Sequence, residues 1–455
     1  MQMGEMAVPF WKNDRITPAQ IIILGFLLLI TVGTVLLMLP FATNDPGGAP
    51  FLDALFTATS ATCVTGLVVQ DTALYWSPFG QAVILVLIQI GGMGVVTMAV
   101  AIFIFSGRRI SLKQRWVMQE SISAPQVGGI VRQTRFILKT AVLMEAAGAV
   151  LLALRFCPGM GWKGLWYAVF HSISAFCNAG FDLMGAYSGP CTSLTGWTAD
   201  WLVNLAIILM IVLGGIGFMS WQDFREHKWR LRAMRMQTKV ILSTTGILLV
   251  GGFLYFYFYE FHQPQWRELG AGERFWAALF QTVTPRTAGF NTVDLGEMTP
   301  TSQLMTMFLM LVGGSPGSTA GGFKTTTLAV LLLTTAAVFR RRDTAHCFGR
   351  RIQDEAVHSA TALLVIYLML ALVGGSLICC IDGVGLMPAL FEAASAVATV
   401  GLSLGITAQL STVSHILLIL LMFFGRVGGL TLIYAVSAGD GPTGAKLPLG
   451  RVIVG

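Results

Sequence analysis

The segment FTATSATCVTGL at residues 56–67 has three close copies later in the chain. They read FHSISAFCNAGF at 170–181, FQTVTPRTAGF at 280–290 and FEAASAVATVGL at 391–402. Each copy is short and apolar and has a glycine at or next to its end; these anchor glycines are Gly66, Gly180, Gly289 and Gly401, which are 114, 109 and 112 residues apart. Self-similarity at a nearly fixed period indicates one structural unit that is used four times.

The match between the copies extends beyond the glycines. A Ser-Ala pair begins six positions before the glycine in three copies, at Ser60, Ser174 and Ser395, whereas the third copy is one residue shorter and has Val283 and Thr284 there. Glycine clusters also recur after each copy, as GGMG at 91–94, GGIG at 214–217, GGSPGSTAGG at 313–322 and GRVGG at 425–429. Agreement at two places in every unit makes a chance origin of the repeat implausible.

The chain is too apolar for a water-soluble fold. Of its 455 residues, 55% are hydrophobic and 11% are charged, and the mean hydropathy is +0.73, so a lipid bilayer is its expected solvent. Runs long enough to span a bilayer lie near 19–39, 81–105, 136–154, 201–221, 238–259, 303–338, 358–381 and 412–437. The repeated segments, near 51–66, 164–180, 273–289 and 385–401, are too short to span and fit re-entrant helices followed by extended loops.

We therefore predict an all-α membrane protein with eight transmembrane helices. Four helix, pore-loop, helix (M1-P-M2) repeats would surround a pseudo-fourfold pore, with the repeats at 1–105, 106–221, 222–338 and 339–437 and a tail at 438–455. Lysine and arginine gather in the connections 106–135, 222–239 and 339–351, which we place with both termini on the cytoplasmic side. The net charge of +7 is spread over these clusters, which disfavours a nucleic-acid partner.

Four similar loops around one axis can supply a ring of backbone carbonyls, which replace the water shell of a cation without burying a full charge. Glycine suits the anchor position because it readily takes the positive φ that such a loop needs. Tight turns or close helix packing would explain a single glycine, but four in register favour the ring. We find no paired carboxylates, catalytic triad or metal-ligand cluster at useful spacing, so we expect no enzyme activity and no metal other than potassium.

These motifs resemble the Trk/Ktr/HKT superfamily of potassium transporters, and most closely its Ktr-type (KtrB-like) membrane subunits. CVTGL, FCNAGFD, RTAGFNT and ATVGL look like the four filter loops, and GGSPGSTAGGFKTTT looks like the broken helix of the third repeat. The resemblance covers essentially the whole chain, and it implies potassium uptake across the cytoplasmic (inner) membrane. A serine in place of Gly66 would suggest sodium-selective relatives.

The resemblance also implies which residues hold the ion. These are the residues at the end of each filter loop: Val64, Thr65 and Gly66; Asn178, Ala179 and Gly180; Thr287, Ala288 and Gly289; Thr399, Val400 and Gly401. Most of their side chains differ between repeats, which suits a site that is made of backbone carbonyls.

Glycines and a proline interrupt the third repeat's second span, so helical hydrogen bonding should fail there. The family resemblance implies that this segment, the gate loop, acts as a gate; a static kink is the alternative. Its residues are Gly313, Gly314, Ser315, Pro316, Gly317, Ser318, Thr319, Ala320, Gly321 and Gly322. Lys324 follows as a gate element or as a cation that snorkels to the interface. The resemblance implies that Arg426 controls permeation from below the filter. The alternative is that Arg426 forms an ion pair with a carboxylate on a neighbouring helix.

We expect other charged or reactive residues to have structural roles. We expect Arg286 to lie behind the filter, paired with Glu392, and Glu145 and His171 to be satisfied packing residues. We expect free cysteines, with a Cys157–Cys191 pair as the main exception.

The resemblance further implies a homodimer in a lipid membrane, with the tail 438–455 at its interface. A cytosolic, KtrA-like ring of nucleotide-binding (RCK/KTN-type) subunits would dock on the basic connections, so ATP or ADP would act through that partner and this chain would hold no cofactor. The sequence leaves open whether transport is channel-like or coupled (symport), and whether Na⁺ is an activator. A sodium-permeable or sodium-coupled transporter and a non-transporting membrane scaffold are the competing interpretations.

Overall fold

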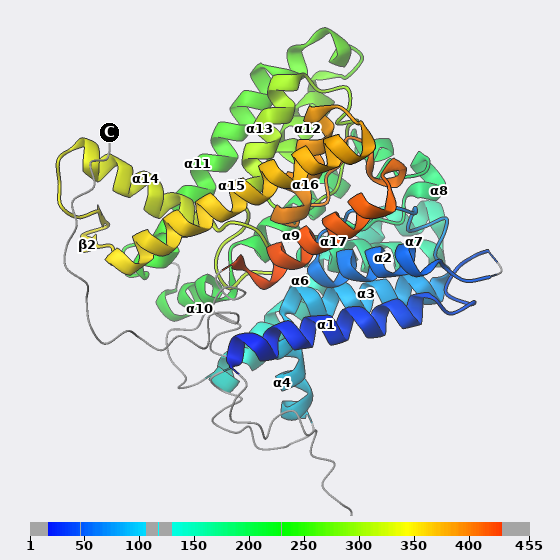
Figure 1. The fold of residues 1–455 in the computed structure, drawn as a ribbon, viewed down its shortest axis with the longest axis horizontal. Helices are drawn as coiled ribbons and strands as arrows, with labels where there is room; N and C mark the ends of the chain where they lie inside the picture. Colours follow the sequence, from blue (N-terminus) through cyan, green and yellow to red (C-terminus); the bar gives the residue numbers. More distant parts are fainter. Residues whose placement is uncertain (1–16, 46, 106–116, 118–129, 229, 430–455) are drawn as a thin grey trace, which may run out of the picture.

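Four long helices form the frame of the protein in a computed structural model that describes residues 17–45, 47–105, 117, 130–228 and 230–429 (Figure 1). They are α1 (Pro18–Leu37), α6 (Ile130–Met160), α11 (Met236–Phe258) and α15 (Asp354–Asp382). All four are long and apolar enough to cross a membrane, as predicted for these stretches. Large apolar side chains such as Leu28 (67% exposed) and Ile247 (72% exposed) point outward from them, which is the pattern of a surface that faces lipid rather than water.

A short helix follows each long helix and packs against it. These short helices are α2 (Phe51–Cys63), α7 (Trp162–Phe176), α12 (Ala271–Val283) and α16 (Leu386–Ala398). They contain the repeated segments, and each ends three to six residues before its anchor glycine. At 13 to 15 residues they are too short to cross a bilayer, as the sequence indicates.

A third set of helices completes the four units. It consists of α3 (Pro78–Met93), α9 (Trp201–Gly215), α13 (Pro300–Leu311) and α17 (Thr412–Val427), whose N-caps Ser77, Asp200, Thr299 and Ser411 all accept a backbone hydrogen bond. Helix α3 packs on α2 and α7, α9 packs on α7 and α12, α13 packs on α16, and α17 packs on α16 and α2. The contact between α17 and α2 joins the last unit to the first, and Figure 1 shows these helices side by side.

The second spans of the first, second and fourth units are not continuous helices, which corrects the sequence prediction for these three units. Gly94 and Gly428 are the C-caps of α3 and α17, and Gly217 lies at the break after α9; all three have φ between 86° and 94° and ψ between 130° and 138°, a conformation that is open to glycine but not to other residues. Beyond the breaks lie α4 (Val95–Phe105) and α10 (Phe218–His227), and the axis bends by 89° between α9 and α10. In the third unit the loop after α13 leads into α14 (Thr325–Phe339).

The remaining elements are short. They are α8 (Gly185–Ser188), the single turns η2 (Thr195–Trp197), η3 (Glu260–His262), η4 (Pro264–Trp266) and η5 (Thr407–Gln409), and the antiparallel hairpin of β1 (His346–Cys347) and β2 (Arg350–Arg351), in which His346 faces Arg351. The expected interface tail at 438–455 and most of the basic connection 106–135 lie outside the described residues. Cys157 and Cys191 are both free thiols, so they do not form the pair left open above.

Candidate functional site

The four anchor glycines meet in a closed ring, here called the glycine ring. At each of them, the space that a Cβ would need is taken by a carbonyl oxygen of the next unit, at 2.2–2.7 Å. The pairs are Gly66 with Ala179, Gly180 with Ala288, Gly289 with Val400, and Gly401 with Thr65. Any side chain at these positions would push a neighbouring loop outward, so the need for glycine is steric as well as conformational.

The backbone takes the same unusual conformation in all four segments. The residue two positions before each anchor glycine has a positive φ: 57° at Val64, 59° at Asn178, 71° at Thr287 and 52° at Thr399. The glycines follow with φ between 71° and 92°. Three of the four non-glycine residues are β-branched, for which this conformation is strained, and such strain persists only where the surrounding structure enforces it.

A hydroxyl group near the end of each short helix braces the segment that follows. The four bonds join Gly66 N–H to Ser60 (3.1 Å), Gly401 N–H to Ser395 (3.0 Å), Ser174 to the Phe181 carbonyl (2.7 Å) and Thr284 to the Phe290 carbonyl (2.6 Å). Thr284 therefore takes the place of the serine in the shorter third copy. Counting back from the glycine alone does not reveal this equivalence.

The second helices of the first, second and fourth units approach the short helices through the first glycine of their clusters. A Cβ on Gly91, Gly214 or Gly425 would lie 2.0–2.1 Å from a carbonyl oxygen in the last turn of a short helix. Those carbonyls belong to Thr62, Phe176 and Val397. The four short helices thus direct their C-terminal ends, which carry partial negative charge, toward the ring.

The gate loop lies directly against the ring segments. A Cβ on Gly321 would lie 1.9 Å from the hydroxyl oxygen of Thr399, and one on Gly313 would lie 3.0 Å from the Thr287 methyl group. The second unit anchors the loop: the Ser315 N–H donates to the Gly215 carbonyl at 2.9 Å, and the Phe218 N–H donates to the Gly317 carbonyl at 2.9 Å. The predicted helix break is confirmed, and the loop that fills it is extensively hydrogen-bonded.

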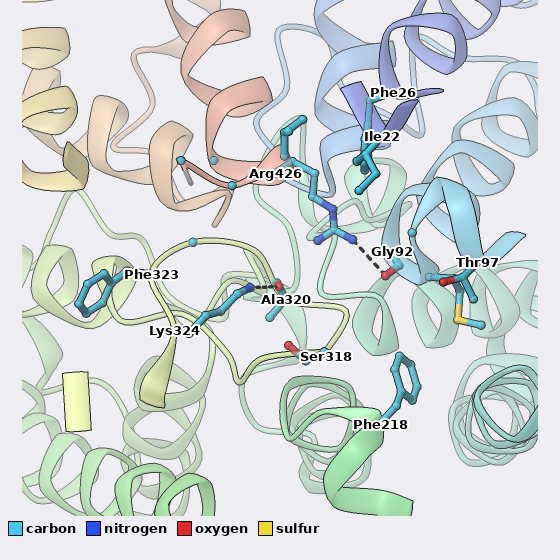
Figure 2. Close-up of a pocket in the computed structure, with 18 of the residues that line it drawn as sticks. Ile22, Phe26, Gly92, Thr97, Phe218, Ser318, Ala320, Phe323, Lys324 and Arg426 are labelled. Atoms are coloured by element: carbon cyan, nitrogen blue, oxygen red, sulfur yellow. Dashed lines mark hydrogen bonds between the residues drawn. The ribbon is translucent and has the colours of Figure 1, made fainter. Parts of the chain in front are cut away.

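Arg426 joins the gate loop to the first unit (Figure 2). Its guanidinium donates to the Thr319 carbonyl at 2.6 Å, to the Gly92 carbonyl at 3.0 Å and to the Gly91 carbonyl. These acceptors are backbone atoms, so the alternative of an ion pair with a carboxylate is not what the described part of the chain shows. The side chain lines a cavity beside the gate loop.

Lys324 also turns toward the gate loop. Its ammonium donates to the carbonyls of Ala320 at 2.7 Å and Gly321 at 3.1 Å, and its side chain lines the same cavity as Arg426 (Figure 2). The ammonium folds back on the loop instead of reaching away from it, which favours the gate-element interpretation over snorkelling.

The predicted pair of Arg286 with Glu392 is wrong. Arg286 is buried and donates to the hydroxyl of Thr245 on α11 at 3.4 Å, and its Nε has no hydrogen-bond partner. Glu392 is also buried, but it accepts from the hydroxyl of Thr407 in its own unit. Opposite charges in adjacent repeats suggested a pair, but each side chain is directed to a neighbour within its own unit.

Two buried titratable residues have the packing roles predicted for them. His171 in α7 lies with Nδ1 2.7 Å from the Tyr167 carbonyl, and its Nε2 accepts from the Leu183 N–H at 3.3 Å, so it ties the short helix to the loop beyond the ring. The carboxylate of Glu145 in α6 accepts two bonds, at 2.9 and 3.2 Å, from the side-chain amide of Gln89 in α3.

Asp182 is a charged residue that the sequence analysis did not single out. It lies two residues beyond Gly180, in the loop between α7 and α8, and accepts from the Met184 N–H at 2.9 Å. Burial and the nearby carboxylate of Asp71 raise the pKa of Asp182 to about 6, although hydrogen bonds from Met184 and Ser193 act in the opposite direction.

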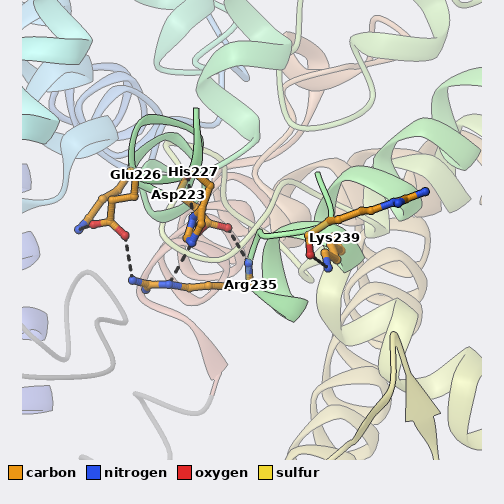
Figure 3. A network of polar contacts seen from close by, with 7 residues as sticks. Asp223, Glu226, His227, Arg235 and Lys239 are labelled. Carbon is orange, nitrogen blue, oxygen red and sulfur yellow. Dashed lines mark hydrogen bonds and ion pairs between the residues drawn. The ribbon is translucent and has the colours of Figure 1, made fainter. Parts of the chain in front are cut away.

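A buried carboxylate organises the basic connection 222–239 (Figure 3). Asp223 in α10 accepts from the backbone N–H of Arg235, the N-cap of α11, at 2.9 Å, and lies 2.9 Å from His227 Nδ1. The Arg235 guanidinium also contacts Glu226 at 3.3 Å. The turn between the two helices is therefore fixed by charge pairs, while other basic side chains such as Arg232 stay exposed.

Comparison with known proteins identifies the family. A family model described as TrkH, a cation transport protein, matches residues 14–439. The chain belongs to the TrkH family of cation transport proteins. Family membership confirms the resemblance to the Trk/Ktr/HKT superfamily and, with the apolar helices, makes the chain a membrane protein of a cation-transport family.

Individual relatives support the same assignment. The chain is 38% identical to the potassium/sodium uptake protein NtpJ of Enterococcus hirae over 450 residues, 97% of this chain and 98% of that protein. It is 37% identical to the Ktr system potassium uptake protein B of Bacillus subtilis over 446 residues, 98% of each chain. The crystal structure of the potassium transporter TrkH from Vibrio parahaemolyticus superposes with a TM-score of 0.73 at 21% identity, covering 95% of this chain and 86% of that one, so this chain shares the fold of that structure.

Proposed function

We propose that this TrkH family protein takes up potassium across the cytoplasmic membrane, through a selectivity filter made of backbone carbonyls at the glycine ring. The single observation that carries the proposal is the ring itself, in which each anchor glycine touches a carbonyl of the next unit. A dehydrated K⁺ needs several oxygen ligands at once, and four loops in one conformation can supply them.

Three further features support a cation at the ring. The repeated positive φ values turn the peptide planes in the same way in each loop, which allows equivalent carbonyls to face one axis. The C-terminal ends of four short helices add partial negative charge. The braces from Ser60, Ser174, Thr284 and Ser395 resist changes in loop position, and a fixed geometry lets a site distinguish ions by size.

We assign the gate to the gate loop, together with Lys324 and Arg426. Two cations below the ring oppose the passage of a third, and the loop fills the space directly against Thr287 and Thr399. Opening then requires the loop to leave its bonds to Gly215, Phe218 and Arg426.

The membrane topology, the oligomeric state and the partner subunits of the protein are proposed by analogy with its relatives. We propose eight membrane crossings in four M1-P-M2 repeats, both termini in the cytoplasm, a homodimer, and a KtrA-like nucleotide-binding ring that docks on exposed basic residues of 222–239 and on the β1–β2 hairpin. ATP or ADP would act through that ring, and Na⁺ is a candidate activator.

A sodium-permeable or sodium-coupled transporter is the second candidate, and one specific observation favours it. The name of the E. hirae relative at 38% identity includes sodium as well as potassium. Glycine at all four anchor positions favours potassium, because the family resemblance associates a serine in place of Gly66 with sodium-selective relatives.

Ion uptake into liposomes tests the proposal. We expect purified native protein, with a regulatory ring supplied, to accumulate K⁺ against competing Na⁺, and Gly66→Ser to lose that preference, because its side chain would meet the Ala179 carbonyl at 2.4 Å. Gly246→Ser is the matched control, since nothing lies within 4 Å of a Cβ there. If native protein moves no cation, the scaffold interpretation replaces the transporter; if it prefers Na⁺, the second candidate replaces the first.

A further inference from the structure

Basic side chains gather where α14 ends and the chain turns into the β1–β2 hairpin. Residues 339–351 contain five arginines and one aspartate. The arginines are Arg340, Arg341, Arg342, Arg350 and Arg351, and all five are exposed. Within the described part of the chain an ion pair is found only for the last of them, which contacts Asp354 at 2.7 Å. Most of this positive charge is therefore not balanced by a neighbouring carboxylate.

The turn that carries the first three arginines, here called the arginine turn, has a fixed backbone. The N–H of Arg341 donates to the Val338 carbonyl and the N–H of Arg342 donates to the Ala337 carbonyl, both at 2.9 Å. Arg341 has a left-handed φ of 50°, so the three features together form a Schellman motif at the end of α14. Glycine takes this conformation at lower cost, and its replacement by arginine favours a role for the side chain.

A small hydrophobic cluster fixes the arginine turn to the end of the helix bundle. Ala337 of α14 is buried with Ala345 and Ile352, which flank the hairpin. Met236 and Val357, in the first turns of α11 and α15, pack against this cluster. The long apolar helices α11 and α15 begin here, so their first turns mark one boundary of the apolar layer, and the arginine turn lies at that boundary (Figure 1).

Exposed apolar side chains continue along α14 up to the arginines. Val338 is 68% exposed and Phe339, directly before Arg340, is 83% exposed. Phe348 in the hairpin is also exposed. An acidic soluble protein could pair with the arginines but would leave these side chains in water, whereas a lipid offers an acidic headgroup and an apolar tail in one molecule.

We propose that the arginine turn binds the headgroup of an anionic phospholipid, whose acyl chains lie along α14 at Val338 and Phe339. The planar guanidinium group binds phosphate oxygens in a bidentate way, and basic residues just beyond a membrane helix each strengthen the binding of anionic lipid about fivefold. The arginine turn precedes the β1–β2 hairpin, so this lipid site lies beside the surface that we assign to the regulatory ring.

A lipid at this place would act on the gate loop through α14. The helix begins directly after Lys324, so one short helix joins the gate loop to the arginine turn. A headgroup that holds the end of α14 favours the position of the gate loop described above, against the glycine ring. Anionic lipid should therefore slow K⁺ uptake. This consequence rests on the proposed function, whereas the lipid binding itself does not.

Native mass spectrometry of the purified full-length protein in non-ionic detergent tests the binding, with phosphatidylglycerol and phosphatidylcholine as the two probes. We expect the first phosphatidylglycerol to bind at least about tenfold more tightly than phosphatidylcholine. The double variant Arg340→Gln with Arg342→Gln should lower the affinity for phosphatidylglycerol at least about tenfold, because each change removes about fivefold. This variant leaves the left-handed Arg341 unchanged, so the backbone of the turn is kept.

Arg230→Gln with Arg232→Gln is the matched control. It removes two exposed arginines from the basic connection 222–239 and should change the affinity less than about twofold. Phe339→Ala separates a lipid from a free phosphate ion: we expect it to weaken the binding of phosphatidylglycerol about threefold, and we expect excess inorganic phosphate to displace no lipid.

Equal affinity for the two lipids, or equal affinity of native protein and the double variant for phosphatidylglycerol, overturns the proposal. Displacement of phosphatidylglycerol by a polyglutamate peptide also overturns it and assigns the surface to an acidic protein. In liposomes, native protein should take up K⁺ more slowly with phosphatidylglycerol present than in phosphatidylcholine alone, and the double variant should lose this difference. Equal uptake in both membranes removes the consequence for the gate, and absence of any uptake counts against the proposed function while mass spectrometry decides the lipid site.

Discussion

Replacing Gly91 by alanine tests how the second helices hold the glycine ring. An added Cβ would lie 2.0 Å from the carbonyl oxygen of Thr62 and 2.8 Å from its carbonyl carbon. Carbon and oxygen rarely approach closer than about 3 Å, so α3 and the end of α2 must separate by roughly 1 Å. The obstacle is backbone and no rotamer change relieves it, so we expect a loss near the upper end of the overpacking range, about 3 kcal/mol of unfolding free energy.

Unfolding in mixed detergent micelles, measured with K⁺ uptake by the same preparation, provides the assay. Gly246→Ala in α11 is the control: nothing lies within 4 Å of its Cβ, so we expect a gain of up to about 1 kcal/mol from better helix propensity. Gly91→Ala should also lower K⁺ uptake, because the displaced Thr62 carbonyl belongs to the helix that supports the first ring segment. A Gly91→Ala protein as stable and as active as native protein would refute the close-packing argument.

Three further changes have definite expected outcomes. Ser60→Ala removes the hydrogen bond that braces Gly66, so it should lower the free energy of unfolding by about 1 kcal/mol and weaken the selectivity for K⁺ over Na⁺ in flux assays. Ser243→Ala, at an exposed site, is the control and should change neither quantity. Burial raises the pKa of Asp182 from 3.8 to about 6, so the folded protein retains a proton that the unfolded chain has lost; thermal stability should fall as pH rises from 4 to 6, and Asp182→Asn should make this fall smaller. Arg426→Gln should increase K⁺ flux by removing a positive barrier, whereas Arg267→Gln should not.

The repeat could be predicted because its strongest constraints act on single residues. A glycine that is required sterically leaves a clear trace in the sequence, and the four anchor positions were located correctly before their contacts were known. The four long helices and four short helices also follow from hydropathy and length.

The breaks in the second spans were harder to predict. The sequence stays apolar across Gly94 and Gly428, and a glycine in an apolar run is compatible with a continuous helix. What ends the helices is the backbone conformation that packing imposes at these glycines, with φ near 90°. Only the third unit, with its proline and additional glycines, carries enough helix-breaking residues for the break to be evident.

Partners of buried charges were the least predictable part of the site. The sequence contains Arg286 and Glu392 but not the direction in which each side chain leaves the backbone, and so the predicted pair is wrong. Likewise, the bonds from Arg426 to Thr319 and Gly92 involve backbone carbonyls, which every residue has and no sequence pattern marks.

Locating the ion at the glycine ring tests the central claim most directly. Crystals grown with Rb⁺ in place of K⁺ would show the ion by its anomalous scattering. We predict a peak enclosed by the carbonyls of Thr65, Ala179, Ala288 and Val400, which excess K⁺ removes and excess Na⁺ does not. No peak within the ring, or one that Na⁺ removes as readily as K⁺, would contradict the proposal that this ring selects potassium.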